Sequence, residues 1–400
     1  MNAPGSRLLQ GIAHCLSLSL VLALAGSATA AEPNTLTPEE LAEGWILLFD
    51  GESLFGWRPA SEADWGVTDG AISVSRGEPG LLATTSQFGN YQLKVDFRSA
   101  PGTNSGVFLR TSPSPKPADV ASKCYELNIA DPATSEYPTG SFAGRQRCRG
   151  DHPSAEWQTF EVTADGGRFQ VKLDGQEVLD YTDPKPPGRG FIGLQLNSGK
   201  VEFRNVKLKP LGLKSLFNGK DLTGWKTYPE MKSRFTVTPE GWLNVKDGKG
   251  QLETEGLYAD FTMQLEVFVN GKGLNSGIFF RSIPGDPMNG YESQIHNGYL
   301  EGDRSRPVDS GTGGIFRRQP ARRVVADDFE WFSNTIHADD KHMAVWVNGY
   351  QVSDWTDPRS PDPNPRRGLR LEAGTIIIQG HDPTTDFSFR NLRIAEIPDR

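Results

Sequence analysis

The chain has 400 residues, which is too many for one small domain and about right for two domains of average size. Charged residues make up 23% and hydrophobic residues 36%, a balance that indicates a globular chain rather than a disordered or membrane-embedded one. With a formal net charge of -8 and no basic block, the chain would repel a phosphate backbone, so nucleic acid is not an expected partner.

The first thirty residues have the pattern of an export signal. Arg7 gives a short positive region, an apolar run covers about 16–25, and Ala28-Thr29-Ala30 offers a small-residue cleavage site. The run is too short and too rich in Ala and Ser for a bilayer span. We expect residues 1–30 to be removed and the mature chain, without a transmembrane span, to be periplasmic or extracellular. An uncleaved anchor is the alternative.

One helix start and many strands are predicted after this segment. Thr37-Pro38-Glu39-Glu40 combines an N-cap threonine with a proline at the first helical position and a Glu three residues after the cap. Residues 91–97 and 261–267 alternate between apolar and polar side chains, which is the period of a β-strand. Asp174-Gly175 and Asn348-Gly349 predict tight hairpin turns, because both central residues of such turns need positive φ.

The chain repeats itself with a period of about 170 residues. The matching segments are 47–58 with 215–226, 104–110 with 275–281, 156–184 with 330–358, and 201–208 with 387–394. Their shared order and near-constant spacing predict a tandem duplication, with a first domain over 40–210 and a second over 211–400. The junction contains no flexible linker, so we expect the two copies to pack together.

Each copy is predicted to be an antiparallel β-sandwich, so the fold class is all-β. Short strands at regular spacing, each with one polar face, are typical of this architecture. The apolar positions of 201–208 change parity halfway, and those of 387–394 do the same. An extra residue near Asn205 and near Asn391 would reset the alternation, so we predict a β-bulge at each place.

Export would leave Cys124 and Cys148 as the remaining cysteines, an even number in an oxidising compartment. We therefore expect a disulfide between them, with two free thiols as the alternative. The second copy has no counterpart of either cysteine, so the bridge would be a local staple. A zinc site is much less expected, because no paired histidines lie nearby.

Strand parity gathers polar side chains on one face of the second copy. The candidates are Asn275 and Arg281 from one segment, Glu292, Gln294 and His296 from the next, and Gln379 and His381 from a third. Burying such a face is costly unless its groups are hydrogen-bonded or wetted. We expect a polar pocket there, with a solvated outer face as the alternative.

The first copy carries fewer proton-transfer groups at the matching positions. These positions hold Asn104, Arg110, Glu126, Asn128, Gln195 and Asn197. Ala130 stands where the second copy has His296, and Asn197 where it has His381. Because histidine moves protons near neutral pH, we expect the chemistry in the second copy and leave sugar binding or a structural role to the first.

Common hydrolase signatures do not occur in the sequence. It contains no G-x-S-x-G, no H-E-x-x-H and no E-x-D-x-x-E set. A conventional two-carboxylate glycosidase is therefore disfavoured, although a catalytic pair formed by carboxylates from distant segments stays an alternative. Trp57, Trp225, Trp157 and Trp331 repeat in register, and we favour core packing for them over stacking on sugar rings.

The landmarks together resemble the 3-keto-disaccharide hydrolase domain family. The opening F-D/N-G-x-x-L-x-G-W, the central N-S-G-hydrophobic-F-x-R, the Y-E-x-Q-I strand and the closing F-R-N occur in order. The resemblance covers nearly all of 45–395, twice. It implies two tandem concanavalin A-like jelly-roll domains and extracytoplasmic handling of carbohydrates oxidised at C3. A sugar oxidoreductase would be the partner that supplies the ketone.

For such a substrate, chemistry favours elimination followed by hydration, because a C3 ketone acidifies the C2 proton. His296 or Glu292 would serve as the base and Arg281 as the stabiliser of the enolate. His381 would protonate the leaving group, and a divalent metal held by His and Glu could replace the arginine. Substrate-binding candidates are Asn275, Gln294, Gln379, Asn104, Arg110, Glu126, Asn128 and Gln195. The alternatives are a non-catalytic carbohydrate-binding protein that uses the same faces, and a scaffold.

Overall fold

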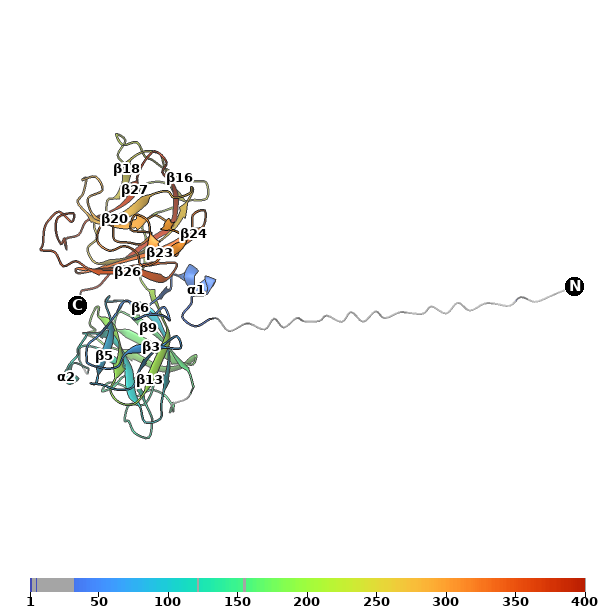
Figure 1. Cartoon of the computed structure of the whole chain (residues 1–400). Coiled ribbons are helices and arrows are strands. Elements are labelled where there is room, and N and C mark those ends of the chain that lie inside the picture. Colours follow the sequence, from blue (N-terminus) through green and yellow to red (C-terminus); the bar gives the residue numbers. More distant parts are fainter. Residues whose placement is uncertain (2–4, 6–31, 121, 154–155, 400) are drawn as a thin grey trace. The chain divides into compact units, whose positions relative to one another are not determined.

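The structure is a computed structural model that describes Met1, Gly5 and residues 32–120, 122–153 and 156–399. Apart from Met1 and Gly5, the predicted signal peptide over 1–30 lies outside the described residues. Residues 33–400 form one compact unit (Figure 1). Within the described part of the chain, no helix is both long and apolar enough to cross a membrane.

The first copy contains two antiparallel sheets. The larger has the order β11-β10-β9-β6-β13-β4-β3, with β1 also on β13, and the smaller has the order β2-β5-β12-β7-β8. The helices are α1 (Pro38–Glu43) and α2 (Pro117–Val120), and the strands are β1 (Ile46–Leu47), β2 (Trp57–Pro59), β3 (Gly66–Thr68), β4 (Ala71–Val74), β5 (Gly80–Thr84), β6 (Tyr91–Ser99), β7 (Asn104–Thr111), β8 (Tyr125–Ala130), β9 (Gln158–Asp165), β10 (Arg168–Leu173), β11 (Gln176–Thr182), β12 (Phe191–Leu196) and β13 (Val201–Pro210).

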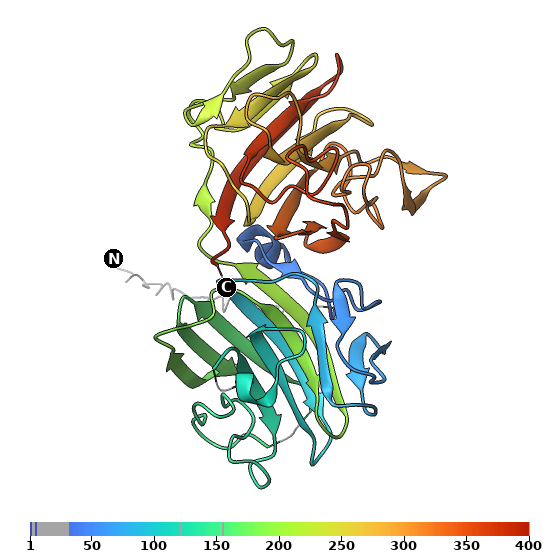
Figure 2. The ribbon, with the colours of Figure 1, turned by 90° about the vertical axis from the view of Figure 1, so that its left-hand side faces the viewer.

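The second copy repeats this arrangement. Its larger sheet has the order β16-β17-β28-β19-β24-β25-β26, with β14 also on β28, and its smaller sheet has the order β15-β18-β27-β20-β21; β22 and β23 form a separate pair. The strands are β14 (Lys214–Ser215), β15 (Trp225–Lys226), β16 (Arg234–Val237), β17 (Leu243–Lys246), β18 (Gly250–Thr254), β19 (Phe261–Val269), β20 (Ser276–Ser282), β21 (Tyr291–Ile295), β22 (Tyr299–Leu300), β23 (Asp303–Pro307), β24 (Trp331–Asp339), β25 (His342–Val347), β26 (Tyr350–Thr356), β27 (Thr375–Gly380) and β28 (Asp386–Glu396). Figure 2 shows the two groups of strands, blue to green and yellow to red.

Alternating side chains hold the sheets of each copy together. In β6 every second residue from Tyr91 to Ser99 is buried, as the sequence pattern predicts. The apolar faces meet in a core, where the rings of Phe97 and Phe160 stack with their centroids 4.5 Å apart. Burial of each such side chain stabilises the fold by roughly 1.5–3 kcal/mol. The all-β class and the sandwich architecture are confirmed.

Both predicted bulges are present. The pairing of β13 with β6 shifts between Arg204 and Lys207, around Asn205, whose φ is 50°. The pairing of β28 with β19 shifts in the same way, and Asn391 has a φ of 53°. Asparagine tolerates this left-handed conformation, which explains why it occurs at the bulge where the alternation of apolar side chains changes face in each copy.

The predicted turns and helix start are also confirmed. Asp174 and Gly175 have φ values of 51° and 78°, and the turn at Asn348-Gly349 has both φ values positive too. Helix α1 begins with a capping box, in which Thr37 and Glu40 each bind the other's backbone amide.

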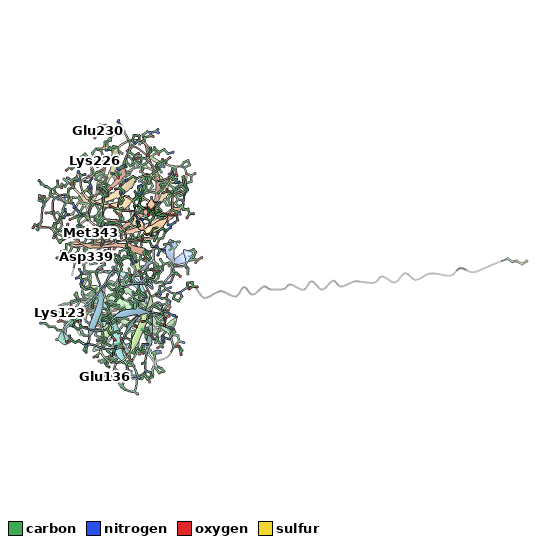
Figure 3. The ribbon with its side chains drawn as sticks, in the orientation of Figure 1. Lys123, Glu136, Lys226, Glu230, Asp339 and Met343 are labelled. Carbon is green, nitrogen blue, oxygen red and sulfur yellow. The ribbon has the colours of Figure 1, made fainter. Side chains whose placement is uncertain are left out.

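Contacts within residues 33–400 join the two copies. The indole Nε1 of Trp346 donates to the carbonyl oxygen of Leu47 at 2.8 Å, and this tryptophan belongs to the hydrophobic core of the first copy. Arg189 pairs with Asp260 at 2.5 Å and with Asp339 at 3.2 Å, the latter labelled in Figure 3. The predicted packing of one copy against the other is confirmed.

The predicted disulfide is not formed, and both thiols are free and buried. Cys124 directs its sulfur to the carbonyl oxygen of Asp119 at 3.8 Å, whereas Cys148 directs its sulfur to that of Thr139 at 3.3 Å. The two side chains also belong to different hydrophobic clusters, so their sulfurs do not meet. Burial raises the pKa of the Cys124 thiol to about 11, which keeps it protonated.

Two of the repeated tryptophans pack in the cores. Trp57 and Trp225 are buried, and their indoles donate to the carbonyl oxygens of Leu48 and Leu216. Core packing is therefore confirmed for this pair.

The other repeated pair is covered by arginines. Arg204 lies 4.0 Å from the ring centroid of Trp157, and Arg390 lies 4.1 Å from that of Trp331. A guanidinium over each ring forms a cation–π contact.

Candidate functional site

A cavity of about 730 Å³ opens on the smaller sheet of the first copy. It lies on the face turned away from the core, because Val107, Leu109 and Leu127 of the same strands point into the core. Its lining includes Leu81, Asn104, Phe108, Glu126, Asn128, Tyr137, Ala143, Gly144, Gln195 and Asn197. We call this surface the pocket face of the first copy. Its volume is within the roughly 300–1,000 Å³ typical of small-molecule sites.

Glu126 is the titratable centre of the pocket face. It lies on β8 opposite Phe108 of β7, next to the position where Asn128 faces Gly106. A Cβ atom on Gly106 would lie 3.1 Å from Cγ of Glu126, so glycine leaves the space that this side chain uses. Burial raises the pKa of Glu126 to about 7, and a hydrogen bond with Gln195 opposes that rise.

Neutral amides surround this carboxyl. Asn128 donates through Nδ2 to the carbonyl oxygen of Tyr137, which ties β8 to the segment over the cavity. Gln195 faces the cavity from β12, and its buried Oε1 finds no hydrogen-bond partner among the described residues. Asn104 and Asn197 add further amides to the lining. The predicted substrate-binding residues of the first copy therefore do come together, with the exception of Arg110.

The second copy has the same backbone at the equivalent place. Glu292 of β21 lies opposite Phe279 of β20, and Gln294 lies opposite Gly277. Gln379 of β27 pairs with Gln251 of β18 further across the sheet. We call the surface formed by Phe279, Glu292, Gln294 and Gln379 the pocket face of the second copy.

The carboxyl of the second pocket face has charged neighbours, unlike that of the first. Burial and the negative charge of Asp309 raise the pKa of Glu292 to about 8, while Arg366 and Arg317 oppose the rise. Asp309 also accepts hydrogen bonds from Asn275 and Gln294. Three predicted residues of the second copy, Asn275, Glu292 and Gln294, thus gather around Asp309, which the sequence patterns did not single out.

A short segment lies beside each pocket face and carries different side chains in the two copies. In the first copy the amide of Ala143 donates to the carbonyl oxygen of Glu126, and in the second the amide of Phe316 donates to that of Glu292. The neighbouring residues are Gly144 and Arg317. Large side chains therefore stand in the second copy where Ala and Gly line the cavity of the first.

The two histidines do not join Glu292 in one hydrogen-bonded group. His296 Nδ1 accepts from the amide of Gly298 at 3.1 Å. His381 Nδ1 contacts the carboxylate of Asp382 at 2.8 Å, within the turn that follows β27. Among the described residues, no three His, Cys, Asp or Glu side chains form a group that could hold a metal ion.

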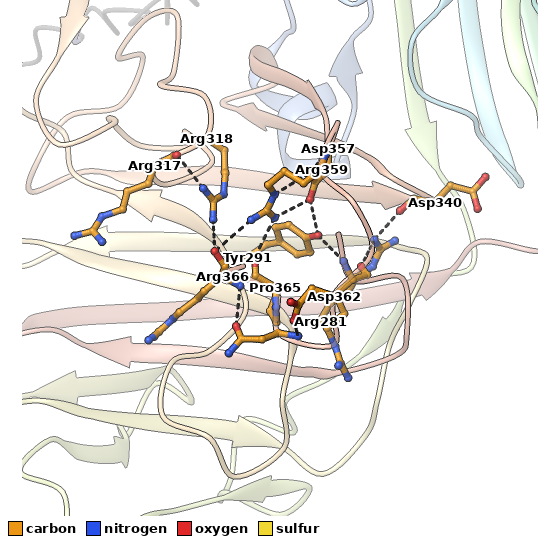
Figure 4. Close-up of polar contacts among 12 residues, drawn as sticks. Arg281, Tyr291, Arg317, Arg318, Asp340, Asp357, Arg359, Asp362, Pro365 and Arg366 are labelled. Carbon is orange, nitrogen blue, oxygen red and sulfur yellow. Dashed lines mark hydrogen bonds and ion pairs between the residues drawn. The ribbon is translucent and has the colours of Figure 1, made fainter. Parts of the chain in front are cut away.

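Arg281 does not face the pocket, contrary to the expectation from strand parity. Its φ is 47°, and the pairing of β20 with β27 shifts between Phe279 and Ser282, so the alternation is broken at the arginine itself. The fully buried guanidinium donates to Asp260 and to the carbonyl oxygens of Ala259, Asp340 and Arg370. Figure 4 shows Arg281 with Asp340. Arg281 is thus a structural residue.

Arg110 repeats this arrangement in the first copy. Its φ is 48°, and its guanidinium donates to the carbonyl oxygens of Gly89, Gly166 and Pro187 and to Oδ1 of Asn90. Arg110 therefore does not line the cavity beside Glu126. An arginine at positive φ is uncommon for a residue with a side chain, so sequence pattern alone gives no sign of the kink.

The sequence patterns did not identify Tyr137, Ala143 or Gly144 as part of the site. A direct alignment of 138–146 with 311–319 carries the signal, since Ala-Gly in the first segment becomes Phe-Arg in the second. They also missed Glu253, a buried carboxylate of β18 that accepts hydrogen bonds from Tyr228, Thr375 and the amide of Gly285.

Comparison with known proteins identifies relatives of both copies. Residues 44–209 and 212–395 each match the family model of the 3-keto-alpha-glucoside-1,2-lyase-like domain. A curated relative, a 3-keto-disaccharide hydrolase of Bacteroides thetaiotaomicron, is 24% identical over 247 residues, which cover 46% of this chain and 84% of the relative.

Solved structures also align with parts of the chain. A protein assigned as a glycosyl hydrolase from Parabacteroides distasonis is 25% identical with a TM-score of 0.41, over 45% of this chain and 100% of that one. A carbohydrate binding module from Bacillus subtilis is 18% identical with a TM-score of 0.28, over 38% of this chain and 94% of that one.

Proposed function

The chain belongs to the 3-keto-alpha-glucoside-1,2-lyase-like domain family, and on that premise we propose that it cleaves glycosides whose sugar carries a ketone at C3. We assign the reaction to the pocket face of the first copy. The observation that carries this assignment is Glu126, a carboxyl with a pKa of about 7 on the wall of an open cavity. A proton-transfer group is most effective when its pKa lies near the working pH.

The first step uses Glu126 as the base. Its carboxylate removes the C2 proton, which the adjacent C3 carbonyl has acidified, and the electron pair moves onto the C3 oxygen as an enolate. At pH 7 roughly half of the Glu126 side chains are ionised, because the pKa of this carboxyl is about 7.

The enolate oxygen needs donors that are already in place. Asn104 and Asn197 line the same cavity and carry amide N–H groups, the kind of neutral donor that stabilises a developing oxyanion. The protonated Glu126 then returns its proton to the leaving oxygen as the C1–O bond breaks. Addition of water to the resulting C1–C2 double bond completes a net hydrolysis.

This proposal moves the chemistry from the second copy, where the distribution of histidines suggested it, to the first. The reasons are that His296 and His381 contact other groups than Glu292, and that Phe316 and Arg317 stand beside the second pocket face.

Two further parts of the proposal rest on the sequence. Residues 1–30 have the pattern of an export signal, which would deliver the chain to the periplasm or the medium. The substrate also requires an oxidoreductase that introduces the C3 ketone, so such an enzyme is the expected functional partner.

The test compares matched carboxyl-to-amide variants of the two copies. We expect Glu126→Gln to lower turnover of a 3-keto-glucoside by about 100-fold or more, and Glu292→Gln to change it little. Wild-type kcat/KM should rise with pH up to about 7, where Glu126 becomes ionised. Loss of turnover in Glu292→Gln alone would place the reaction in the second copy instead.

The alternative is that the pocket binds carbohydrate without cleaving it. A β-sandwich fold by itself does not decide between binding and catalysis, and a face lined by amides suits sugar hydroxyls. Incubation with a 3-keto-glucoside and with the unoxidised parent separates the two cases. Saturable binding of both sugars with no product would establish the binding function.

A further inference from the structure

The second copy carries a group of arginines that the first lacks. Figure 4 shows Arg317, Arg318 and Arg366, which we call the arginine cluster. Arg317 and Arg366 act on Glu292 of the second pocket face, and Arg318 donates to the carbonyl oxygens of both. Arg366 belongs to an insertion, because 16 residues from Arg359 to Gly374 replace the shorter segment from Lys185 to Gly190. Arg317 replaces Gly144, so two of the three positive charges are particular to this copy.

The carboxylates nearby have other partners, since Asp309 accepts from Asn275 and Gln294 and two further carboxylates pair with arginines outside the cluster. Asp357 binds Arg359 at 2.7 Å, and Asp362 binds Arg367 at 3.4 Å. In the first copy the residue matching Arg318 is Arg145, which pairs with Asp183 at 3.2 Å. In the second copy the aspartate at the matching position, Asp357, is paired with Arg359. Among the described residues, Arg318 donates instead to the carbonyl oxygens of Arg317 and Arg366.

The three guanidinium groups therefore carry charge without a carboxylate partner among the described residues. Glu292 does not supply the missing charge near neutral pH, because burial raises its pKa to about 8. Burial, and after it the positive charges of Arg359 and Arg317, lower the pKa of Arg318. Arg317 and Arg366 are both exposed, so a ligand can reach them.

A second observation on the same face points to hydroxyl donors. Gln294 and Gln379 are 1% and 7% exposed, and the Oε1 atom of each finds no hydrogen-bond partner among the described residues. Buried acceptors of this kind usually have a partner in water or a ligand. Their amide nitrogens already donate to the carbonyl oxygen of Asp309 and to the sulfur of Met288, so each side chain still offers a ligand one acceptor oxygen.

We propose that the second copy binds an acidic saccharide on this face, with its carboxylate or sulfate on the arginine cluster and its hydroxyls on Gln294 and Gln379. A sugar acid offers both features that the face requires, an anion for planar guanidinium groups and O–H donors for amide oxygens. A neutral sugar would leave the arginines unpaired. The ring of Phe316 lies 5.1 Å from the guanidinium carbon of Arg317, so an apolar surface for the ring of the sugar adjoins the cluster.

This site is separate from the proposed reaction in the first copy and does not depend on it. The chain would hold an acidic polysaccharide through its second copy and present its first copy to glycosides nearby. Tethering of this kind raises the local concentration of substrate without any new contact in the reacting pocket.

Calorimetric titration of the full chain tests the proposal with three oligosaccharides of equal length, one carrying carboxylates, one carrying sulfates and one neutral. We expect at least one acidic ligand to bind and the neutral one not to bind. Arg317→Gln and Arg366→Gln should each weaken the acidic ligand by about tenfold or more. Arg317→Lys should restore part of the loss, because it keeps the charge without the planar fork.

The matched control is Arg367→Gln, an exposed arginine of the same insertion that is already paired with Asp362. It should bind the acidic ligand as the wild type does. Equal binding of the neutral ligand, or undiminished binding of the acidic ligand in both Arg317→Gln and Arg366→Gln, would overturn the proposal. Since the replaced side chains are exposed, thermal unfolding of each variant should match that of the wild type.

Discussion

The two copies have equivalent strands and differ in the side chains that lie beside the glutamate of each. Each has a glutamate on the second strand of a hairpin, a glycine opposite the next position and a short segment that bonds to the glutamate's own carbonyl group. In the first copy this segment contributes Ala143 and Gly144, and a cavity of about 730 Å³ lies beside Glu126. In the second it contributes Phe316 and Arg317. A duplicated sheet can thus keep its strands and change its chemistry through two neighbouring side chains.

The largest effect is expected where the copies are most alike, at their buried arginines. Arg110→Leu and Arg281→Leu should each lower the free energy of unfolding by about 3–5 kcal/mol, because several buried acceptors lose their donors. Chemical denaturation measures the change. Arg168→Leu, which removes an exposed arginine paired with Asp180, is the control and should cost much less. A loss of activity without a loss of stability in Arg281→Leu would return that arginine to a role in the reaction.

An exchange of side chains between the copies tests what keeps the first pocket open. Ala143→Phe gives the first copy the residue of the second and should reduce kcat/KM for a 3-keto-glucoside on the order of 100-fold, since the ring would displace the substrate. Phe316→Ala makes the reverse change and should leave turnover unaltered. If both variants retain full activity, the cavity beside Glu126 is not where the substrate is bound.

The two glutamates should differ in how they couple stability to pH. Each has a pKa raised above 4.5, to about 7 for Glu126 and about 8 for Glu292. The folded state therefore holds a proton that the unfolded state has lost, and stability falls as the pH rises from about 4.5 to the folded pKa. Replacement by Gln removes this loss. Both variants should gain stability over wild type between pH 5 and pH 9, and Glu292→Gln at least as much as Glu126→Gln, because the pKa of Glu292 is raised further.

Urea unfolding at the two pH values measures these gains. Glu330→Gln, which alters an exposed carboxylate, is the control and should follow the wild type. An identical pH dependence for the wild type and both variants would mean that neither carboxyl is desolvated in the folded protein.

The smallest effect concerns the two cysteines, which only the first copy has. Because Cys124 and Cys148 are free, a reducing agent should shift the melting temperature by less than about 1 °C, whereas removal of a native disulfide typically costs 2–5 kcal/mol. Thiol labelling after denaturation without reductant should find both thiols in the mature chain. Labelling of neither would show that the bridge forms after all.

Features that depend on local spacing were predictable from the sequence. The strands follow from alternation, and the change of parity around Asn205 and Asn391 predicted a bulge in each copy because one extra residue moves all later side chains to the other face. The same reasoning failed at Arg281. There the kink falls on the arginine itself, and nothing in the pattern N-S-G-I-F-F-R indicates a left-handed residue at its end.

The composition of the site was partly predictable and its openness was not. Parity placed Glu126, Asn128 and Gln195 on one face, as the structure has them. Whether that face is open depends on a segment that reaches it from outside the sheet, and strand periodicity says nothing of such a segment. The two histidines led us to predict the reaction in the second copy, because a residue's type can be read from the sequence but its surroundings in the fold cannot.

The contact between Trp346 and Leu47 joins residues 299 positions apart. It has a consequence for how the protein is made. The ribosome would synthesise the opening strand of the first copy long before Trp346, whose indole completes the core around that strand. The amide of Leu47, in the same strand, also donates to the carbonyl oxygen of Gly349. Until synthesis is nearly finished, the first copy therefore has an unfilled edge. A chain that ends before Trp346 would therefore lack part of the core of the half that holds Glu126.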